Sequence, residues 1–418
     1  MTTTINPSGS GADGDASDTA RRAERGAPAR LSGNTVWNVI DLIRRDDGIS
    51  RTELAQRIGL SVQGISKVVG RLLEVGLVVE SGRRVSGGVG KFRTRLSIVA
   101  ESRYALGAHL DRGHYTVSLV DLSGRRVGRV EDQFGGTFAP EEAVSRLADG
   151  AESLLLDARV EAAKVIGCGL GMAGPLDHFR GLVTAPNNFF GWHNVPLAAM
   201  MSTRLHMPVK LDKNTNLLAM AEQWRAPRSE WLAMVYVGTG IGAGLVLDGS
   251  LYRGSSSTAG EFGHMVLDPA GPECVCGRFG CVEVLASPAA VVERYRQRAG
   301  TGGGAAAPGW GEGMQDRLRD VVRLAARGDG SATFALAESG RLLGIAAGNL
   351  VTLLDVDSVV LAGPMLEQVG SLYVGGVETG LRLTQGTTGR PVRFTVSDFP
   401  ADAIDIGAAL LMFSEIAI

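Results

Sequence analysis

The sequence has no run of about eighteen apolar residues, so it contains no candidate for a membrane-spanning helix. Its N-terminus also lacks the order of charged and then apolar residues that is typical of a secretory signal peptide. Only four cysteines occur in 418 residues, and nothing in their spacing indicates an oxidising compartment. A large net charge is missing too, with 42 Lys and Arg against 44 Asp and Glu. These absences predict a cytoplasmic protein with no membrane partner, and they leave nucleic-acid binding open.

The scarce cysteines are concentrated in one place. Cys274, Cys276 and Cys281 fall within eight residues, and His264 precedes them by ten across a Gly-Pro linker. Three soft thiolates and one imidazole favour a tetrahedral zinc ion, and four protein ligands leave no open position for a catalytic water, so the site is predicted to be structural. The alternative is a disulfide or a chance cluster, but a Cys-x-Cys pair closes a strained ring. Cys168, in an apolar run, is predicted to be an inert core residue.

These residues carry a resemblance to a known family. The pattern from Gly260-Glu261-x-Gly263-His264 to Cys281-x-Glu283 is similar to the zinc signature of the ROK family, whose members are bacterial repressors and sugar kinases. The resemblance extends over about residues 31–418. It implies that the metal braces a sugar pocket, and that Glu261, His264 and Glu283 touch the sugar.

The length predicts more than one domain, because 418 residues exceed what one hydrophobic core usually supports. We predict a disordered tail over residues 1–30, where large apolar side chains are almost absent, a DNA-binding domain over 31–100, and a sugar-sensing domain over 101–418. The fold class is α/β: a winged helix-turn-helix followed by two α/β lobes with a structural zinc site. That the lobes are actin-like, or ribonuclease-H-like, is implied by the resemblance.

A helix-turn-helix is predicted from three short helical patterns after Asn34. The first ends at Asp46-Asp47-Gly48, and Ser50-Arg51-Thr52-Glu53 is a capping box that begins the second. The third covers Ser61–Leu73, with an apolar face that is expected to pack inward. That face consists of Val62, Ile65, Val68, Val69, Leu72 and Leu73. Two alternating segments then predict a β-hairpin wing, with a Gly-rich tip that is expected to hold Arg83, Arg84, Lys91 and Arg93.

Residues 31–100 hold eleven Lys and Arg against six Asp and Glu, so this segment is basic although the whole chain is not. Gln63 is predicted to read an adenine edge, with Ser66 and Lys67 behind it, and Arg71 and the wing cations to hold phosphate. The predicted DNA contacts are Ser61, Gln63, Ser66, Lys67, Arg71, Arg83, Arg84, Lys91 and Arg93. The alternative is a small helical segment that mediates protein contacts.

Two similar α/β lobes are predicted from a recurring order of strands, helix and strand. The main segments are strands 105–110, 115–121, 165–170, 232–237, 245–247 and 358–362, and helices 140–158, 315–326 and 331–353, with a loop over 301–314. Residues 402–416 are expected to form the closing helix of the second lobe.

The resemblance also implies which residues would transfer phosphate in a kinase of this family. The first phosphate motif, Asp-x-Gly-Gly-Thr in the kinases, corresponds to His109–Gly113, where both the acid and the glycine pair are absent. The position of the catalytic base carries Asn214, and an amide cannot accept a proton. The second phosphate loop, Gly238–Gly242, is intact, but a tight turn would explain it equally well. We therefore predict no catalytic residues and no enzyme activity.

The predicted ligand contacts are Asn187, Asn188, Lys213, Asn214, Glu261, His264 and Glu283. Asn187 and Asn188 belong to a segment that resembles the family's Pro-Asn…Gly-Trp loop, in which an amide and an aromatic wall meet the sugar. Lys213 replaces an Asn of the family. It predicts an anionic ligand, an ion pair with Asp212 or a pocket glutamate, or a solvated side chain at the rim, and it makes plain glucose doubtful.

The sequence thus predicts a sugar-responsive regulator, most simply a repressor, that binds an operator as a homodimer or homotetramer and carries a structural Zn²⁺ ion. Dimerisation rests on the resemblance and on the symmetry of two half-sites. The alternatives are an ATP-dependent sugar kinase with an appended DNA-binding head and a zinc-braced scaffold without a small ligand.

Overall fold

The computed structural model describes residues 33–85, 92–186, 189, 191–225, 229–301, 313–385, 391–397, 399 and 403–416. The predicted tail over residues 1–30 lies outside these ranges, as do Lys91, Asn187, Asn188 and most of the predicted loop 301–314. Within the described part of the chain, no helix is both long and apolar enough to cross a membrane.

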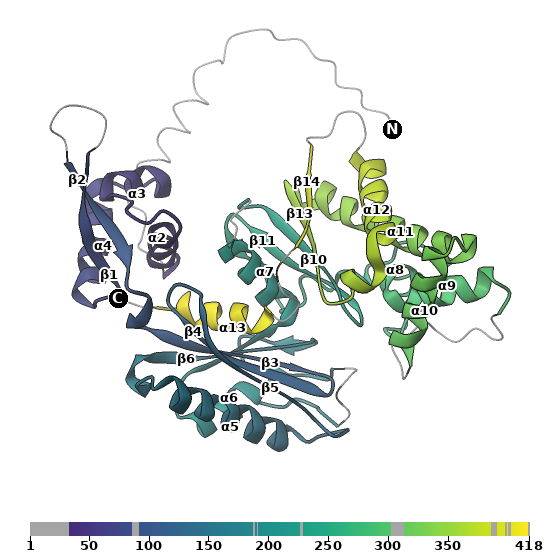
Figure 1. The fold of residues 1–418 in the computed structure, drawn as a ribbon, viewed down its shortest axis with the longest axis horizontal. Helices are drawn as coiled ribbons and strands as arrows, with labels where there is room; N and C mark the ends of the chain where they lie inside the picture. Colours follow the sequence, from purple (N-terminus) through teal and green to yellow (C-terminus); the bar gives the residue numbers. More distant parts are fainter. Residues whose placement is uncertain are drawn as a thin grey trace, which may run out of the picture.

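The N-terminal part is a head of three helices and a two-stranded hairpin (Figure 1). Its elements are α2 (Gly33–Arg45), α3 (Arg51–Ile58), α4 (Val62–Glu74), β1 (Val78–Val85) and β2 (Phe92–Ile98). The capping box at Ser50 is present, and Gly59 ends α3 in the left-handed conformation that glycine adopts without strain. A winged helix-turn-helix is therefore confirmed.

Two details of the head differ from the prediction. Val62 is 47% exposed, because it is the first residue of α4. Ile65 and Val69, further along the same helix, are buried. Arg83, Arg84 and Arg93 lie on the paired strands and not in the wing tip, since the hairpin continues to the pair Val85↔Phe92.

The rest of the chain forms two lobes, each built on a five-stranded sheet with the same strand order (Figure 1). The first sheet has the order β5-β4-β3-β6-β9, with bounds β3 (Tyr104–Asp111), β4 (His114–Asp121), β5 (Arg126–Gln133), β6 (Val165–Met172) and β9 (Val209–Lys213). The second has the order β12-β11-β10-β13-β14, with bounds β10 (Leu232–Val237), β11 (Ile241–Leu247), β12 (Ser250–Leu251), β13 (Ser358–Ala362) and β14 (Arg393–Val396).

Strand directions match as well, since each sheet has an antiparallel three-stranded meander followed by two parallel strands. The prediction of two similar lobes is confirmed. One boundary differs: β11 begins at Ile241, so only Gly238-Thr239-Gly240 remain as the turn. A small hairpin of β7 (Leu176–Asp177) and β8 (Leu182–Val183) follows β6.

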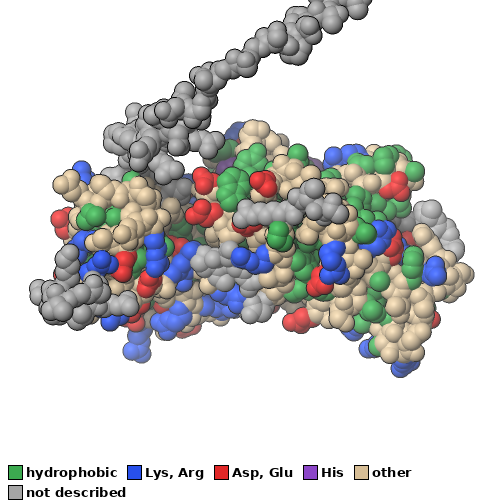
Figure 2. Space-filling view, turned by 90° about the horizontal axis from the view of Figure 1, so that it is seen from above, with side chains coloured by type: hydrophobic (Ala, Val, Ile, Leu, Met, Phe, Trp, Pro, Cys, Tyr) green, Lys and Arg blue, Asp and Glu red, His purple; other side chains and the backbone are tan. Residues whose placement is uncertain are grey.

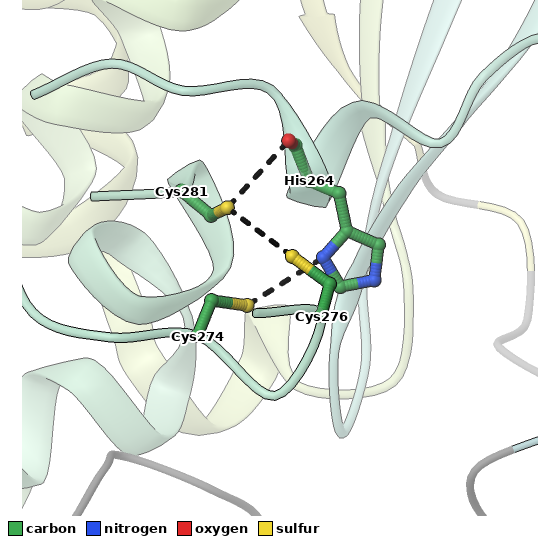
Figure 3. Close-up of side chains that lie close together, drawn as sticks. All are labelled: His264, Cys274, Cys276 and Cys281. Atoms are coloured by element: carbon green, nitrogen blue, oxygen red, sulfur yellow. Dashed lines mark hydrogen bonds between the residues drawn. The ribbon is translucent and has the colours of Figure 1, made fainter. Parts of the chain in front are cut away.

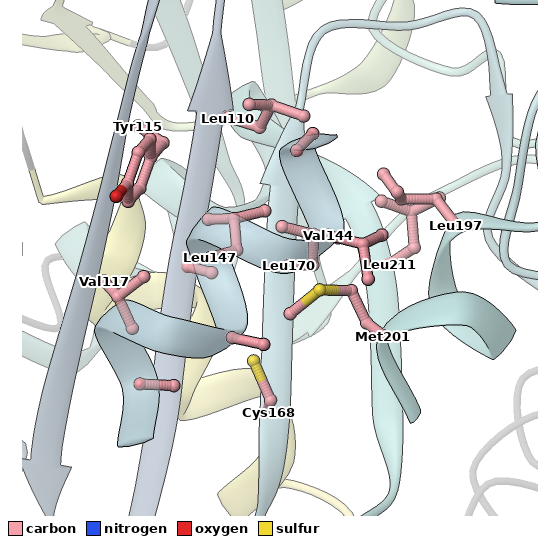
Figure 4. Close-up of a cluster of buried hydrophobic side chains, with 14 of the residues drawn as sticks. Leu110, Tyr115, Val117, Val144, Leu147, Cys168, Leu170, Leu197, Met201 and Leu211 are labelled. Atoms are coloured by element: carbon pink, nitrogen blue, oxygen red, sulfur yellow. The ribbon is translucent and has the colours of Figure 1, made fainter. Parts of the chain in front are cut away.

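Helices cover the outer face of each sheet. On the first lobe, α5 (Pro140–Ala158) and α6 (Leu197–Leu205) bury Val144, Leu147 and Met201 against Leu170 and Leu211 of the sheet (Figure 4). On the second, the helices are α8 (Val282–Ala286), α9 (Pro288–Arg298), α10 (Met314–Ala326), α11 (Gly330–Leu354) and α12 (Leu366–Gln385). Short 3₁₀ turns occupy Ala100–Ser102, Ala162–Lys164 and Phe262–His264.

Two helices lie between the sheets, and they correct one prediction. α13 (Ile404–Phe413) packs on β3 and β6 of the first sheet, and α7 (Asn214–Arg225) packs on α13 and on β11 of the second. The C-terminal helix is therefore not the closing helix of the second lobe. Its end, with Leu410 and Phe413, also belongs to the hydrophobic core of the head, so α13 joins the head to the first lobe.

Candidate functional site

The four predicted metal ligands come together in one loop of the second lobe (Figure 3). The ligand atoms of His264, Cys274, Cys276 and Cys281 all lie within 4.8 Å of one another. Sγ of Cys276 is 3.6 Å from Sγ of Cys281, and Sγ of Cys274 is 3.6 Å from Nδ1 of His264. A tetrahedron with metal–sulfur bonds of about 2.3 Å has edges of about 3.8 Å. The group therefore has the donor set and the spacing to hold a metal ion.

The backbone brings these ligands together before any metal is considered. The amide of Cys274 donates to the carbonyl of Arg278, and the amide of Gly277 donates back to Cys274, which closes a tight turn. Gly280 has a φ of +61°, and a Cβ there would lie 1.5 Å from the carbonyl oxygen of Asp268. Only glycine fits at this position, because the loop crosses its own upstream segment there.

The protonation of the ligands suits metal binding. Burial lowers the pKa of His264, so its imidazole is neutral near pH 7 and offers a lone pair. Burial opposes ionisation of Cys276, but the guanidinium and backbone of Arg278 outweigh it and lower the pKa of this thiol to about 7. Burial raises the pKa of Cys274, and it raises that of Cys281 to about 12. The buried thiols become thiolates only when a cation replaces their protons.

Lys213 lies at the carboxyl end of β9, at the edge of the first sheet that faces the second lobe. Its side chain is 4% exposed, and Nζ donates to Oε1 of Glu261 at 3.0 Å and to the carbonyl oxygen of Ala259. The prediction of a solvated lysine at the rim is wrong. The pocket-glutamate partner, which was one of the alternatives, is the one found.

Two further polar contacts join the lobes beside this pair. Asp212 is 1% exposed, and Oδ2 accepts from Nε of Arg253 at 2.6 Å, while Oδ1 accepts from Nδ2 of Asn216 at 2.8 Å. His178, after β7, has Nδ1 2.6 Å from Oγ of Ser257. Sequence reasoning missed Arg253, His178 and Ser257, because no motif marks them and their partners lie 41 and 79 residues away.

Glu283 lies under the turn between β10 and β11. Its Oε2 accepts from the amide of Ile241 at 2.7 Å, and a Cβ added to Gly240 or Gly263 would lie 3.2 Å and 2.9 Å from its carboxylate oxygens. Burial raises the pKa of Glu283 to about 7, although the Ile241 amide acts in the opposite direction. The glycines of this turn therefore make room for a carboxylate of the same lobe.

The residues at the two kinase positions have local partners. Oδ1 of Asn214, at the start of α7, accepts from the amide of Thr215 at 2.8 Å. Oδ1 of Asp111 accepts from the amide of Arg112 at 2.7 Å, and Asp111 pairs with His114 across a two-residue turn. Gly113 in that turn has a φ of +98°. In this chain the turn of the first lobe is thus a short hairpin closed by its own carboxylate.

The described aromatic residues of the predicted sugar wall, Phe189 and Trp192, are buried. Asn187 and Asn188 lie outside the described residues, but Trp192, which follows them, is 1% exposed. Its Nε1 donates to the carbonyl of Phe138 at 3.1 Å, and its ring packs edge-on against Phe138 and tilted against Phe189. Trp192 is therefore a core residue of the first lobe.

The predicted DNA-reading face of α4 is solvent-accessible. Gln63, Lys67 and Arg71 are exposed at four-residue spacing, and Ser66 is half-buried beside them. Ser61 is the N-cap of α4, and its Oγ accepts from the amide of Gly64 at 3.1 Å. The exposed Val62 joins this face as an apolar side chain that sequence reasoning assigned to the core.

Charges of both signs lie on the face of the molecule that Figure 2 shows. On the face seen in Figure 2, Lys and Arg side chains are spread along the length of the molecule, with Asp and Glu among them. In the head, Arg51 pairs with Glu80 at 2.9 Å and Arg93 with Glu53 at 3.4 Å. These two ion pairs partly neutralise the basic excess of the head.

Comparison with known proteins gives two family matches. Residues 112–415 match the ROK family, and residues 34–79 match the winged helix-turn-helix DNA-binding family. The xylose repressor of Bacillus subtilis is 27% identical over 329 residues, which cover 78% of this chain and 80% of the relative. The N-acetylglucosamine repressor of Escherichia coli O157:H7 is 26% identical over 344 residues, which cover 81% of each.

Solved structures give the same picture. A ROK family transcriptional regulator, a homologue of the Escherichia coli MLC protein, superposes with a TM-score of 0.73 at 24% identity and covers 92% of this chain and 96% of its own. The ROK hexokinase of Thermus thermophilus superposes with a TM-score of 0.64 at 28% identity and covers 75% of this chain and 98% of its own. The kinase match leaves out about the length of the head, whereas the regulator match includes it.

Proposed function

Because the chain belongs to the ROK family, we propose that it is a DNA-binding repressor whose operator affinity is set by a sugar bound between the two lobes. The observation that carries this proposal is the pairing of a winged helix-turn-helix with a sugar-kinase scaffold whose base position holds Asn214. An amide at that position cannot take the proton of a sugar hydroxyl. The similar proteins named for xylose and N-acetylglucosamine are repressors, which supports the same role here.

We propose zinc as the metal of the Cys₃His group. Three thiolates and an imidazole are a donor set that zinc accepts in tetrahedral geometry, and four protein ligands complete its coordination. The ion would tie His264 to the cysteine loop and so hold Glu261 and Glu283, which flank that loop, at the interlobe cleft. Its role is structural.

We propose a neutral sugar as the effector. Among the described residues, Lys213 is paired with Glu261 and Arg253 with Asp212, so neither of these two cations calls for an anionic ligand. This argument removes the reason for doubting glucose. The ligand contacts proposed remain Asn187, Asn188, Lys213, Asn214, Glu261, His264 and Glu283.

We propose that α4 reads the major groove and that the wing holds phosphate. Gln63, Ser66 and Lys67 would contact base edges, and Val62 would contact a thymine methyl. Arg71 and the wing residues Arg83, Arg84, Lys91 and Arg93 would contact phosphate, together with Ser61 at the start of α4. A homodimer or homotetramer would present two heads to an inverted repeat, and such a regulator acts in the cytoplasm.

The test is selection of a binding sequence from random duplex DNA by the zinc-loaded full-length protein, followed by gel-shift titration with D-xylose, D-glucose and N-acetylglucosamine. We expect one inverted-repeat sequence, an affinity that falls steeply with salt, and a change of about 5-fold or more with at least one sugar. Gln63→Ala should weaken binding to the selected sequence by about 10-fold, in line with the loss of one base contact.

The matched control is Arg317→Ala, which removes an exposed cation of α10, a helix that packs on α9, α11 and α12 of the second lobe, and should leave DNA affinity unchanged. Failure to select any sequence, or equal losses for Gln63→Ala and Arg317→Ala, would argue against the proposed DNA surface. If a sequence is selected but none of the sugars changes the affinity for it, the DNA-binding function is supported and the proposed sugar effector is contradicted.

A further inference from the structure

Three side chains join the head to the end of α7, and we call them the tryptophan clasp: Trp37, Arg44 and Trp224. The rings of Trp37 and Trp224 stack with centroids 4.5 Å apart and an interplanar angle of 13°. Cζ of Arg44 lies 3.9 Å from the centroid of the Trp224 ring. Trp37 and Arg44 are two helical turns apart on one face of α2, while Trp224 closes α7 of the sugar-sensing part.

The same contact caps the C-terminus of α7. The last carbonyls of a helix have no partner within it, and they carry the negative end of the helix dipole. Here the carbonyl of Trp224 accepts from Arg44, and that of Gln223 accepts from Nη2 of Arg45 at 3.2 Å. Asp41, between them in space, is 9% exposed and pairs with both arginines, which fixes their direction. The head therefore contacts the end of α7 through ring stacking and through two hydrogen bonds from arginine side chains.

The other end of α7 begins beside the ion pairs that join the two lobes. Its first residue, Asn214, follows Lys213 and Asp212, which form the ion pairs with Glu261 and Arg253 of the second lobe. Asn216, in the first turn, also donates to Asp212. Any change in those ion pairs therefore acts on the first turn of α7. The helix has twelve residues, so about 18 Å separates its two ends.

Close packing along α7 leaves little room for it to bend. A Cβ added to Gly244 of β11 would lie 2.3 Å from the carbonyl oxygen of Thr215, and one added to Gly407 of α13 would lie 1.8 Å from that of Leu217. Backbone therefore touches backbone on two sides, and a shift at one end of the helix is expected to move the whole element.

We propose that α7 is the element that couples the interlobe cleft to the DNA-binding head, with Trp37 and Trp224 as positioning residues that transmit its displacement to α2. This inference rests on the proposed function and deepens it by naming how the sugar site is regulated. A ligand that draws Glu261 away from Lys213 would shift the start of α7, and the clasp would turn the head relative to the first lobe. The ligand needs different affinities for the two positions of α7 to have this effect.

The test is a double-mutant cycle between the two ends of α7, using zinc-loaded full-length protein and Lys213→Met, Trp37→Leu and the double variant. The first readout, without DNA, is amide hydrogen exchange in α2. We expect Lys213→Met to change exchange in α2 at least threefold, and Trp37→Leu to abolish that response. The second readout is affinity for the selected DNA, where the two substitutions should depart from additivity by at least threefold.

Trp231→Leu is the matched control, since Trp231 is 40% exposed and lies outside the clasp, and it should leave the response of α2 to Lys213→Met intact. Should Trp37→Leu fail to fold, Arg44→Gln removes the cation over Trp224 and one carbonyl cap, and is expected to give the same loss of coupling. Unchanged exchange in α2 for Lys213→Met, or an additive cycle, would overturn the proposal.

The outcomes also separate this inference from the proposed function. If the protein selects no DNA sequence but Lys213→Met changes hydrogen exchange in α2, the coupling through α7 is supported and the repressor function is contradicted. If the protein binds DNA in a sugar-dependent way but neither substitution changes hydrogen exchange in α2, the repressor function is supported and the coupling through the tryptophan clasp is contradicted.

Discussion

The two lobes have the same strand order, yet they are held together in different ways. In the first lobe, α13 is fixed by the buried carboxylate of Asp405, which accepts from Oγ of Ser118 at 2.6 Å and from Arg126 at 2.8 Å. In the second, the loop that carries Glu261 and Glu283 is fixed by a group with the geometry of a metal site. The lobe attached to the head thus relies on packing and a buried ion pair, and we propose that the second lobe relies on a metal held by its Cys₃His group.

The corresponding turns of the two sheets differ as well. The β3–β4 turn consists of Arg112 and Gly113 and is closed by Asp111, whereas the β10–β11 turn is a three-residue glycine turn that accommodates Glu283. In the first turn, Asp111 accepts from the Arg112 amide, and in the second, Glu283 accepts from the Ile241 amide. The strand scaffold is the same at both positions, but the two turns differ in length and in the carboxylate that closes them.

Metal removal is expected to produce the largest difference between the two lobes. Structural zinc sites contribute on the order of 10 kcal/mol to small zinc-binding domains, so Cys281→Ser or chelation should lower the unfolding temperature by about 10 °C or more. Sugar-induced stabilisation should disappear together with it, because Glu261 and Glu283 lose their support. Differential scanning calorimetry with metal analysis measures both effects.

Cys168→Ala is the control for that experiment, because Cys168 is 1% exposed in the first-lobe core, where burial raises its pKa to about 12 (Figure 4). It should retain one zinc per chain and lose only about 1 kcal/mol of stability. If the chelated protein unfolded at the same temperature as the untreated protein, the second lobe would not depend on a metal, and the proposed difference between the lobes would be contradicted.

The first lobe should respond to loss of its buried ion pair. Asp405 is fully buried, so Asp405→Asn removes the carboxylate charge that faces Arg126 and Arg129, and breaking one side of a buried pair costs about 3 kcal/mol. The midpoint of urea unfolding, followed by tryptophan fluorescence, measures this loss. Zinc content should stay unchanged.

Asp149→Asn is the matched control, since Asp149 is 61% exposed and pairs with Arg204 at the surface of the same lobe. Its effect should stay below about 0.5 kcal/mol. If both substitutions changed the stability by the same small amount, α13 would be held by apolar packing alone. The two lobes would then differ in that the first is stabilised by packing and the second by a metal.

Sequence reasoning succeeded where the residues that determine a feature lie close together in the chain. The capping box at Ser50 and the helix Pro140–Ala158 could be predicted because their determinants lie within a few residues. The place of α13 could not, since an apolar helix with nine buried residues out of ten has no polar face to show which sheet it covers. Lys213 and Glu261 are 48 residues apart, and their ion pair required the fold.

The smallest expected effect concerns nucleotide, and it tests whether the two turns have both lost phosphate binding. Mg-ATP at millimolar concentration should shift the unfolding temperature by less than about 1 °C, because a ligand stabilises only in proportion to its affinity for the folded state. Asn214→Asp should restore the carboxylate but give no sugar-dependent ADP release. The reason is that Asp111 and Arg112 still occupy the first turn, at the positions where the kinase motif has its glycine pair. Stabilisation by Mg-ATP together with ADP release in Asn214→Asp would show that the turns still bind phosphate, and that one side chain alone separates this protein from the kinases that share its scaffold.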